Sequence, residues 1–418
     1  MLNPNDKNIL VAIPLMNEFE NISTLMECLA DQKLRAKVIA LCVNQPKHWS
    51  DSPDKKEIVC NNIKTLNYLN QISTSYPIKL IILDHASTGK GFASKIPSVG
   101  LARKLCIDAL LPLANDDDII VNIDADTYYP SNYLNSLYNI YKQLPLLQGI
   151  CAPYYHKINN LSSNQALLML RYEIFLRYYT IQLLLIKSPY AYMPIGSAIS
   201  FTVRAYKKSG RFKIRDAGED FYTMQKIRKI GMVSGWSDTN VYPSARSSDR
   251  VVFGTGPAIN LTLREQSKKY PFYPTQLFEA IRDIYQSIEH FDMIDDIVNH
   301  LEKIIPREII TKIHNNNPKK HRFIHAIHEY FDAFHIIKYL NKNYKVDPEK
   351  DFEHFKKFIK INFNKEIKYD KWEQIPIDEL NTIRDQLYKF ELNLQKSKYN
   401  YLINNQNNDK IWKYLSTW

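Results

Sequence analysis

Short apolar runs alternate with helical segments over the first part of the chain. Four runs rich in β-branched residues are separated by amphipathic stretches, which is the pattern of a parallel sheet with crossover helices. The predicted strands cover residues 9–14, 38–43, 78–83 and 119–123. A further strand at 197–201 and a helix beginning near Glu219 follow. We therefore expect an α/β fold with a mostly parallel sheet and flanking helices.

The pattern changes after about Asn260, where β-branched clusters become rare and helical periodicity dominates. We expect two parts, a catalytic domain over residues 1–260 and an all-helical C-terminal region over 261–418. An aromatic-rich helix is predicted over 165–187, inside the first part. It contains Arg171, Glu173 and Arg177, and three charges are too costly for a simple membrane-spanning helix.

Histidines recur at helical spacing in the C-terminal region. The set is His321, His325, His328 and His335, with Asp332 at a matching position. One helix would place them along a single stripe, which could bind zinc. Apolar residues fill the neighbouring face, so we expect an amphipathic helix with a polar margin and no zinc site.

Composition and charge narrow the class of protein. The chain has 418 residues, of which 45% are hydrophobic and 24% are charged, as in a folded globular protein. Of its net charge of +11, residues 1–260 carry +8, from 29 Lys and Arg against 21 Asp and Glu. A positive charge on this part suits an anionic substrate such as a nucleotide diphosphate, or an anionic membrane surface. A lysine-rich surface that is only solvated would give the same net charge. We expect no nucleic-acid partner, because no basic run interleaved with aromatic residues occurs.

The cysteines and the N-terminal segment bear on the compartment. The five cysteines are an odd number without a C-x-x-C pair, which favours reduced thiols. The first apolar run follows acidic and polar residues and does not resemble a signal peptide. We expect a cytoplasmic protein, with peripheral contact at the inner membrane face as an extension of that hypothesis.

Polar residues follow each predicted strand. Ligands of open α/β sheets bind in the crevice at the carboxyl ends of the strands, so one edge of this sheet gathers the candidate residues. In chain order they are Asn17 and Glu18, Asn44, Asp84, and Asp124 with Asp126.

The strongest candidate among these residues is the aspartate pair in IIVNIDADTYYP. Residues two apart in an extended segment face the same side, so Asp124 and Asp126 can point into one cleft. Paired carboxylates favour a hard cation, Mg²⁺ or Mn²⁺, which usually shares its ligands with substrate phosphates. An ordinary turn with Asx-type hydrogen bonds is the alternative for this motif taken alone.

Several segments together resemble family 2 glycosyltransferases. They are VAIPLMNE, the loop at Asp84, VGLARKLCIDAL, DADTYYP, IGSAISF and GEDFYTMQKI, in the family's order over residues 8–260. The chain also resembles a bacterial subgroup of that family, of unassigned substrate, through YEIFLRYY, PYAY and SARSSDRVVFGTG. The resemblance implies a GT-A-like fold, a nucleotide-sugar donor and a divalent metal, Mn²⁺ or Mg²⁺.

The resemblance also implies roles for single residues. Donor-binding positions would be Pro14, Asn17, Glu18, Asp84, Arg103 and Asp124. Asp126 would hold the metal together with Asp124, and Gly196 and Ser197 would line the acceptor side. Many relatives supply a metal-binding histidine after the acidic helix start, but this chain has none between His156 and His290. The third metal ligand is therefore open.

A second acidic pair, Glu219 and Asp220, opens the helix of GEDFYTMQKI. The helix dipole stabilises a carboxylate in the first turn, so we expect both to be ionised. The resemblance makes Asp220 the base that takes the acceptor's proton, with Glu219 orienting the acceptor or the base. Helix capping is the alternative, since Gly218 followed by two acids is a good helix start.

Two arginines follow in the segment SARSSDRVVFGTG. Guanidinium groups bind phosphate oxygens in a bidentate way, so Arg246 and Arg250 could stabilise a leaving diphosphate. The alternative is a salt-bridged surface loop around Asp249.

The function expected from the sequence is inverting transfer of a sugar from a nucleoside diphosphate to a hydroxyl of a glycan or lipid-linked acceptor. Nucleotidyl transfer also uses paired aspartates and a divalent metal, but its glycine-rich basic signature near the N-terminus is absent. An inactive glycosyltransferase-like scaffold is the remaining alternative, and intact Asp124, Asp126 and Asp220 argue against it.

Overall fold

The computed structural model describes the chain except residues 1–6, 95, 213–217, 247–254, 291–293 and 406–418. The chain forms two compact units. The first consists of Met1–Asn160 and Pro194–Pro257, and the second of Leu161–Met193 and Ala258–Trp418. The division at residue 260 into a catalytic domain and a helical region was drawn from the change in sequence pattern and stays a prediction.

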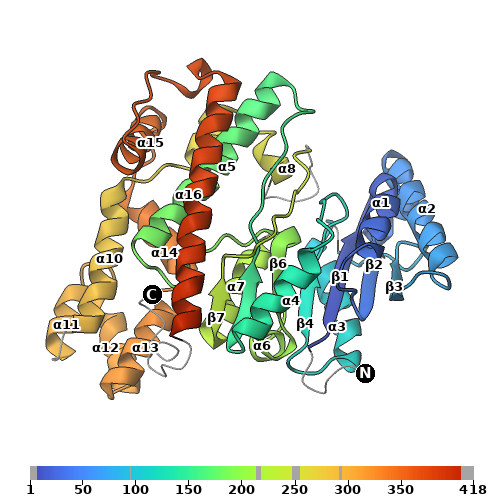
Figure 1. Cartoon of the computed structure of the whole chain (residues 1–418), viewed down its shortest axis with the longest axis horizontal. Helices are drawn as coiled ribbons and strands as arrows, with labels where there is room; N and C mark the ends of the chain where they lie inside the picture. Colours follow the sequence, from blue (N-terminus) through green and yellow to red (C-terminus); the bar gives the residue numbers. More distant parts are fainter. Residues whose placement is uncertain (1–6, 95, 213–217, 247–254, 291–293, 406–418) are drawn as a thin grey trace. The chain divides into compact units, whose positions relative to one another are not determined.

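A seven-stranded sheet organises the first unit, in the order β3-β2-β1-β4-β6-β5-β7 (Figure 1). Its strands are β1 (Ile9–Leu15), β2 (Val38–Asn44), β3 (Lys79–His85), β4 (Ile119–Asn122), β5 (Leu147–Cys151), β6 (Ile199–Thr202) and β7 (Met232–Ser234). All neighbouring pairs are parallel except those of β6, which runs antiparallel to both β4 and β5. The predicted α/β fold with a mostly parallel sheet is confirmed.

Buried strands explain why the apolar runs were continuous rather than alternating. Every residue of β2 and β4 is buried, because helices cover parallel strands on both faces. In the first unit α3 (Val99–Leu110) packs on β1 and β2, α2 (Lys56–Ile72) on β2 and β3, and α7 (Glu219–Ile230) on β5 and β7. The remaining helices of this unit include α1 (Phe19–Ala30), α4 (Tyr133–Gln143) and α6 (Val203–Lys208).

The parallel register brings the strand ends to one edge of the sheet. Ala12 pairs with Asn122, and Val43 pairs with Asp84. The segments that follow β1, β3 and β4 therefore leave the sheet at the same edge, where the sequence placed its candidate residues.

The second unit is helical, which confirms the predicted helical C-terminal region. Its longest helices, α5 (Ser163–Leu185) and α16 (Ile377–Asn404), lie side by side (Figure 1). The others are α9 (Leu263–Lys269), α10 (Thr275–His290), α11 (Ile294–Leu301), α12 (Arg307–Asn316), α13 (Lys320–Tyr330), α14 (Ala333–Asn343) and α15 (Pro348–Phe363). A short helix, α8 (Thr255–Ala258), spans the boundary between the two units.

The helix α5 is buried on all sides, and its charged residues are paired. Arg177 donates to Glu173 Oε1 from Nε at 3.0 Å and to Glu391 Oε2 from Nη1 at 3.0 Å. Arg384 of α16 also donates to Glu173 Oε1, at 3.3 Å. Buried charges are tolerated when they are paired in this way. None of the helices within the described residues is long and apolar enough to cross a membrane.

The expectation that one helix of the C-terminal region carries all the histidines from His321 to His335 is wrong. The chain forms two helices, because Asp332 caps α14 by accepting the backbone N–H of His335 at 3.1 Å. This N-cap breaks the helical spacing that seemed to align the histidines. Within the part of the chain that the structure describes, no group of three or more His, Cys, Asp or Glu side chains could hold a metal ion.

Candidate active site

Arg103 joins two acidic segments that lie far apart in the sequence. Its side chain projects from α3 and is only 4% exposed. From Nη2 it donates to both oxygens of Asp124, at 2.7 and 2.9 Å, and from Nη1 to Glu219 Oε1. Burial disfavours the charge of Arg103, but Asp124 and Glu219 outweigh burial and raise its pKa. The carboxyl end of β4 and the N-terminus of α7 therefore share one cation.

The segment at Gly196 lies directly against this cation. A Cβ atom at Gly196 would be 2.5 Å from both terminal nitrogens of Arg103, so a side chain there would clash with the guanidinium. The phenol of Tyr129 holds the neighbouring Ser197, because its Oη accepts from the backbone N of Asp124 at 3.0 Å and donates to Ser197 O at 2.9 Å. The two predicted acceptor-side residues are thus brought beside Asp124.

A second arginine, Arg246, joins the ends of β1 and β4. Its Nη2 donates to Glu18 Oε1, and its Nε lies 2.8 Å from Asp126 Oδ2. Glu18 is buried where it caps the start of α1, while Arg246 and Asp126 have 34% and 24% of their side-chain surface exposed. Burial disfavours the charge of Arg246, but Asp126 and Glu18 raise its pKa. The other predicted arginine, Arg250, lies outside the described residues.

Asp220 stands next to the Arg103 cluster, at the second position of α7. Burial raises its pKa to about 7, the charge of Glu219 adds to this effect, and Arg103 opposes it. Its Oδ1 accepts from the backbone N of Phe221 at 2.7 Å. Burial thus acts against the ionisation of Asp220 that we expect from the helix dipole, and the ionised state of this carboxylate stays a prediction.

Asn17 and Asp84, two further donor-side candidates, belong to a hydrogen-bonded chain across the ends of β1, β2 and β3. The backbone N of Asn17 donates to Asn62 Oδ1 at 2.7 Å, and Asn62 Nδ2 donates to Gln45 Oε1 at 2.9 Å. Gln45 Nε2 then donates to the backbone O of Ala86 at 2.8 Å, and the N of Ala86 donates to Asp84 Oδ1 at 3.1 Å. Asn17 itself has a positive φ of 58°, which asparagine tolerates better than most residues.

Asp84 is held inside its own loop. Burial would raise its pKa, but Lys90, whose Nζ lies 2.8 Å from Oδ2, and the N–H groups of Ser87 and Ala86 bring it well below the usual range. Pro14 is half-buried in β1. Among the described residues, no hydrogen bond or ion pair joins Pro14 or Asp84 to the clusters around Arg103 and Arg246.

The sequence analysis did not identify three residues that hold the segments at the strand ends in place. Tyr129 follows the acidic motif and could have been suspected from that place alone. Gln45 follows a strand directly, but Asn62 lies on α2, in a segment to which the sequence assigns no role. Both amide side chains are completely buried, which explains their effect on the strand ends.

The carboxylates do not form a metal cage of their own. Asp124 accepts from Arg103 with both oxygens, and Asp126 pairs with Arg246. Mg²⁺ and Mn²⁺ need only one or two protein carboxylates when phosphates and waters complete their ligand set. The residues therefore fit a metal that arrives with a diphosphate, and they do not fit one held by protein alone.

No protein-family model and no curated protein matches the chain. Among solved structures it is similar to residues 1–349 of TarS from S. aureus in complex with UDP-GlcNAc, with 14% identity and a TM-score of 0.38 over 94% of this chain and 91% of that chain. It is also similar to the mannosyltransferase PcManGT from Pyrobaculum calidifontis in complex with GDP-Man and Mn²⁺, with 11% identity and a TM-score of 0.39 over 95% and 88% of the two chains.

A third similarity is to glucosyl-3-phosphoglycerate synthase from Mycobacterium tuberculosis in complex with Mn²⁺, UDP and glucosyl-3-phosphoglycerate. The identity is 12% and the TM-score 0.33, over 63% of this chain and 80% of that chain. Because identities and TM-scores are this low, we draw no conclusion about function from them and rely on the residues of the site.

Proposed function

We propose that the chain is an inverting glycosyltransferase of the family 2 kind, which moves a sugar from a nucleoside diphosphate to a hydroxyl group. The observation that carries this proposal is the cluster around Arg103. Asp124, Glu219 and Asp220 come from distant segments and lie around one cation at the carboxyl edge of the sheet. Unlike the fully buried Arg171–Asp351 pair of the second unit, this cluster reaches the surface, because Asp124 keeps 30% of its side chain exposed.

Asp220 has the properties of a general base. A base works best when its pKa is close to the operating pH, and burial brings the pKa of Asp220 to about 7. In the proposed reaction Asp220 takes the proton of the acceptor hydroxyl while the acceptor oxygen attacks the anomeric carbon. The bond from that carbon to the diphosphate oxygen breaks on the opposite side, so the configuration inverts.

In this proposal Arg246 and Asp126 stabilise the leaving diphosphate. Glu18 orients the guanidinium of Arg246, which can bind phosphate oxygens in a bidentate way. Asp126, with Asp124 beside it, would hold Mn²⁺ or Mg²⁺ together with the diphosphate. A bound divalent metal supplies additional stabilisation of the negative charge that grows on the leaving group.

The hydrogen-bonded chain from Asn17 to Asp84 supports a donor site on the other side of β1. It fixes the segments that follow three neighbouring strands, where we place the base and ribose of the donor with Pro14 and Glu18. We place the acceptor beside Gly196 and Ser197. The charge of +8 on residues 1–260 suits the anionic donor, and it would also allow a cytoplasmic protein to reach a lipid-linked acceptor at a membrane surface.

The test separates binding from chemistry. A panel of UDP- and GDP-sugars with Mn²⁺ is screened by thermal shift, because a ligand that binds only the folded state raises its melting temperature. Asp220→Asn is expected to keep the calorimetric affinity for the selected donor within about twofold and to lower transfer or donor hydrolysis by at least about a hundredfold, the low end for general-base catalysis.

Asp117→Asn is the matched control, because Asp117 is an exposed acid that pairs with Arg204 on the surface. It is expected to change neither quantity. Equal loss of affinity and turnover in Asp220→Asn would contradict the base role, and the absence of binding by every nucleotide sugar would contradict the proposed function.

A further inference from the structure

Three tyrosines gather beside the acidic motif. The rings of Tyr128 and Tyr242 are 5.9 Å apart and tilted, and the ring of Tyr155 meets Tyr242 edge-on at 6.3 Å. Tyr128 has 54% of its surface exposed, which is unusual for a large aromatic residue next to a buried charge cluster. We call Tyr128, Tyr155, Tyr242 and Lys157 the tyrosine platform.

The backbone fixes these rings in place. Tyr128 and Tyr242 form an isolated antiparallel bridge, in which each backbone N donates to the other residue's O at 3.0 Å. The backbone N of Tyr155 donates to Val241 O, also at 3.0 Å. Three separate segments of the first unit therefore hold the rings, and no side-chain rearrangement is needed to bring them together.

Lys157 supplies a positive charge at the same place. Its Nζ lies 4.9 Å from the centre of the Tyr242 ring and 5.5 Å from that of Tyr128. The side chain is exposed, and none of the acidic residues that the structure describes forms an ion pair with it. A cationic ligand would be repelled by this ammonium group, whereas an anionic group can pair with it at the edge of the rings.

The segments that carry Tyr128 and Tyr242 also carry residues of the proposed reaction centre. Tyr128 is two residues from Asp126, roughly 7 Å along an extended chain. Tyr242 is four residues before Arg246, and Arg246 pairs with Asp126. The platform residues follow β4, β5 and β7, whereas the hydrogen-bonded chain of the donor side follows β1, β2 and β3.

We propose that the tyrosine platform is a binding subsite for a saccharide ring that carries an anionic group, such as a hexose phosphate. The apolar face of a pyranose ring packs on the exposed face of Tyr128, hydroxyl groups of the sugar meet the phenols, and the anionic group pairs with Lys157. The assignment of this saccharide as the acceptor rests on the proposed glycosyltransferase function, but binding itself does not.

Binding is measured on the full chain by saturation-transfer NMR titrations, with glucose 6-phosphate and the neutral methyl glucoside as probes. Glucose 6-phosphate is expected to bind more tightly than methyl glucoside. Tyr128→Ala is expected to weaken the binding of glucose 6-phosphate about tenfold, the usual size for loss of an aromatic anchor, and Tyr128→Phe to retain it. Lys157→Ala is expected to abolish the preference for the phosphorylated probe.

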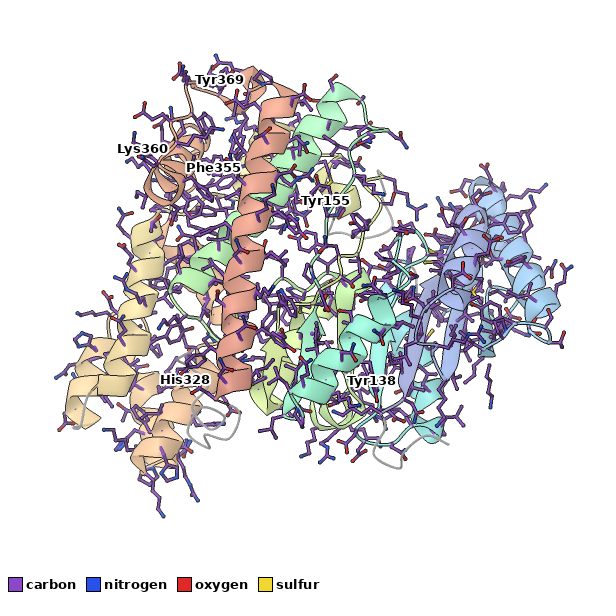
Figure 2. The ribbon with its side chains drawn as sticks, viewed as in Figure 1. Tyr138, Tyr155, His328, Phe355, Lys360 and Tyr369 are labelled. Carbon is purple, nitrogen blue, oxygen red and sulfur yellow. The ribbon has the colours of Figure 1, made fainter. Side chains whose placement is uncertain are left out.

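Tyr138→Ala is the matched control. Tyr138 is a half-exposed tyrosine of α4 with Lys142 Nζ 5.9 Å from its ring centre, and it lies well away from Tyr155 (Figure 2). This variant should bind both probes like the original chain. Failure of the original chain to bind glucose 6-phosphate, equal binding of the two probes, or the same loss in Tyr138→Ala would overturn the proposal.

The two proposals can fail separately. A chain that binds glucose 6-phosphate through Tyr128 but binds no nucleotide sugar would contradict the glycosyltransferase function and leave the saccharide site standing. A chain that turns over a nucleotide sugar but shows no saccharide binding at the platform would contradict the site and leave the function standing.

Discussion

The buried cation Arg103 offers the sharpest test of how the site is built. In Arg103→Met the side chain keeps much of its length but loses its charge, so Asp124 and Glu219 are left without their shared partner. At the 2.7 Å that separates Nη2 from Asp124 Oδ1, an effective dielectric constant of about 20 gives an attraction of about 6 kcal/mol. Part of this is offset by desolvation, and removing one partner of a buried pair typically costs about 3–5 kcal/mol.

The stability lost in Arg103→Met should depend on pH, and the direction of this dependence follows from the pKa of Asp220. Without Arg103 the pKa of Asp220 rises further, because Arg103 opposes the rise that burial and Glu219 cause. Groups whose pKa is raised in the folded state stabilise it at low pH and lose that contribution as the pH rises. The destabilisation of Arg103→Met should therefore be larger at pH 8 than at pH 5, by up to about 1.4 kcal/mol for each unit by which the pKa of Asp220 rises.

The assay is hydrogen exchange in urea, followed by mass spectrometry in peptides from α3 and β4. It reports on the first unit by itself, which matters because a chain of two units need not unfold in one step. Arg204→Met is the matched control, since Arg204 pairs with Asp117 at 2.8 Å but both side chains are largely exposed. Such a surface pair is worth less than about 1 kcal/mol.

Adding Asp124→Asn and Glu219→Gln to Arg103→Met should restore most of the lost stability, because the unpaired charges are then gone. A loss in Arg103→Met no larger than in Arg204→Met, or a loss equal at pH 5 and pH 8, would refute the reasoning.

Two further predictions concern single carboxylates. Asp126→Ala should abolish the dependence of donor turnover on Mn²⁺, because this partly exposed acid is the proposed metal ligand and lies beside the arginine proposed to bind the diphosphate; an unchanged Mn²⁺ titration of turnover would exclude Asp126 as a ligand. In the second unit, burial raises the pKa of Glu391 to about 7, against the opposing effect of Arg177. Hydrogen exchange in α16 should therefore show stability falling by up to roughly 3 kcal/mol as the pH rises from about 4.5 to about 7, and Glu391→Gln should remove this slope; a slope that persists in the variant would show that another group is responsible.

The sequence predicted β1, β2 and β4 well because these strands are almost wholly buried, whereas it predicted no strand at β5 or β7. Continuous apolar runs leave little choice of structure, and the polar residues after them had to fall at the edge of a parallel sheet. What the sequence could not provide was the pairing of side chains across that edge. Arg103 and Glu219 are separated by 116 positions, and nothing local to either residue indicates the other.

Local sequence features were an incomplete guide at two further places. The spacing of His328 and His335 suited one helix, but Asp332 between them is a strong N-cap and starts a new one. For Asp220 the sequence showed the helix start but not the burial that raises its pKa, because burial depends on the rest of the fold.

Both units contain arginines paired with buried acids, yet we propose a binding site at only one of these clusters. In the second unit Arg171 and Asp351 are completely buried, so their charges satisfy each other and no ligand can reach them. In the first unit Asp124, Asp126 and Arg246 keep 30%, 24% and 34% of their side-chain surfaces exposed. An ion pair that stabilises only a fold gains nothing from such exposure, since water weakens the attraction. Partial exposure at the edge where the strands end would let Arg246 exchange Asp126 for a diphosphate, and it is the physical reason for the reaction site that we propose.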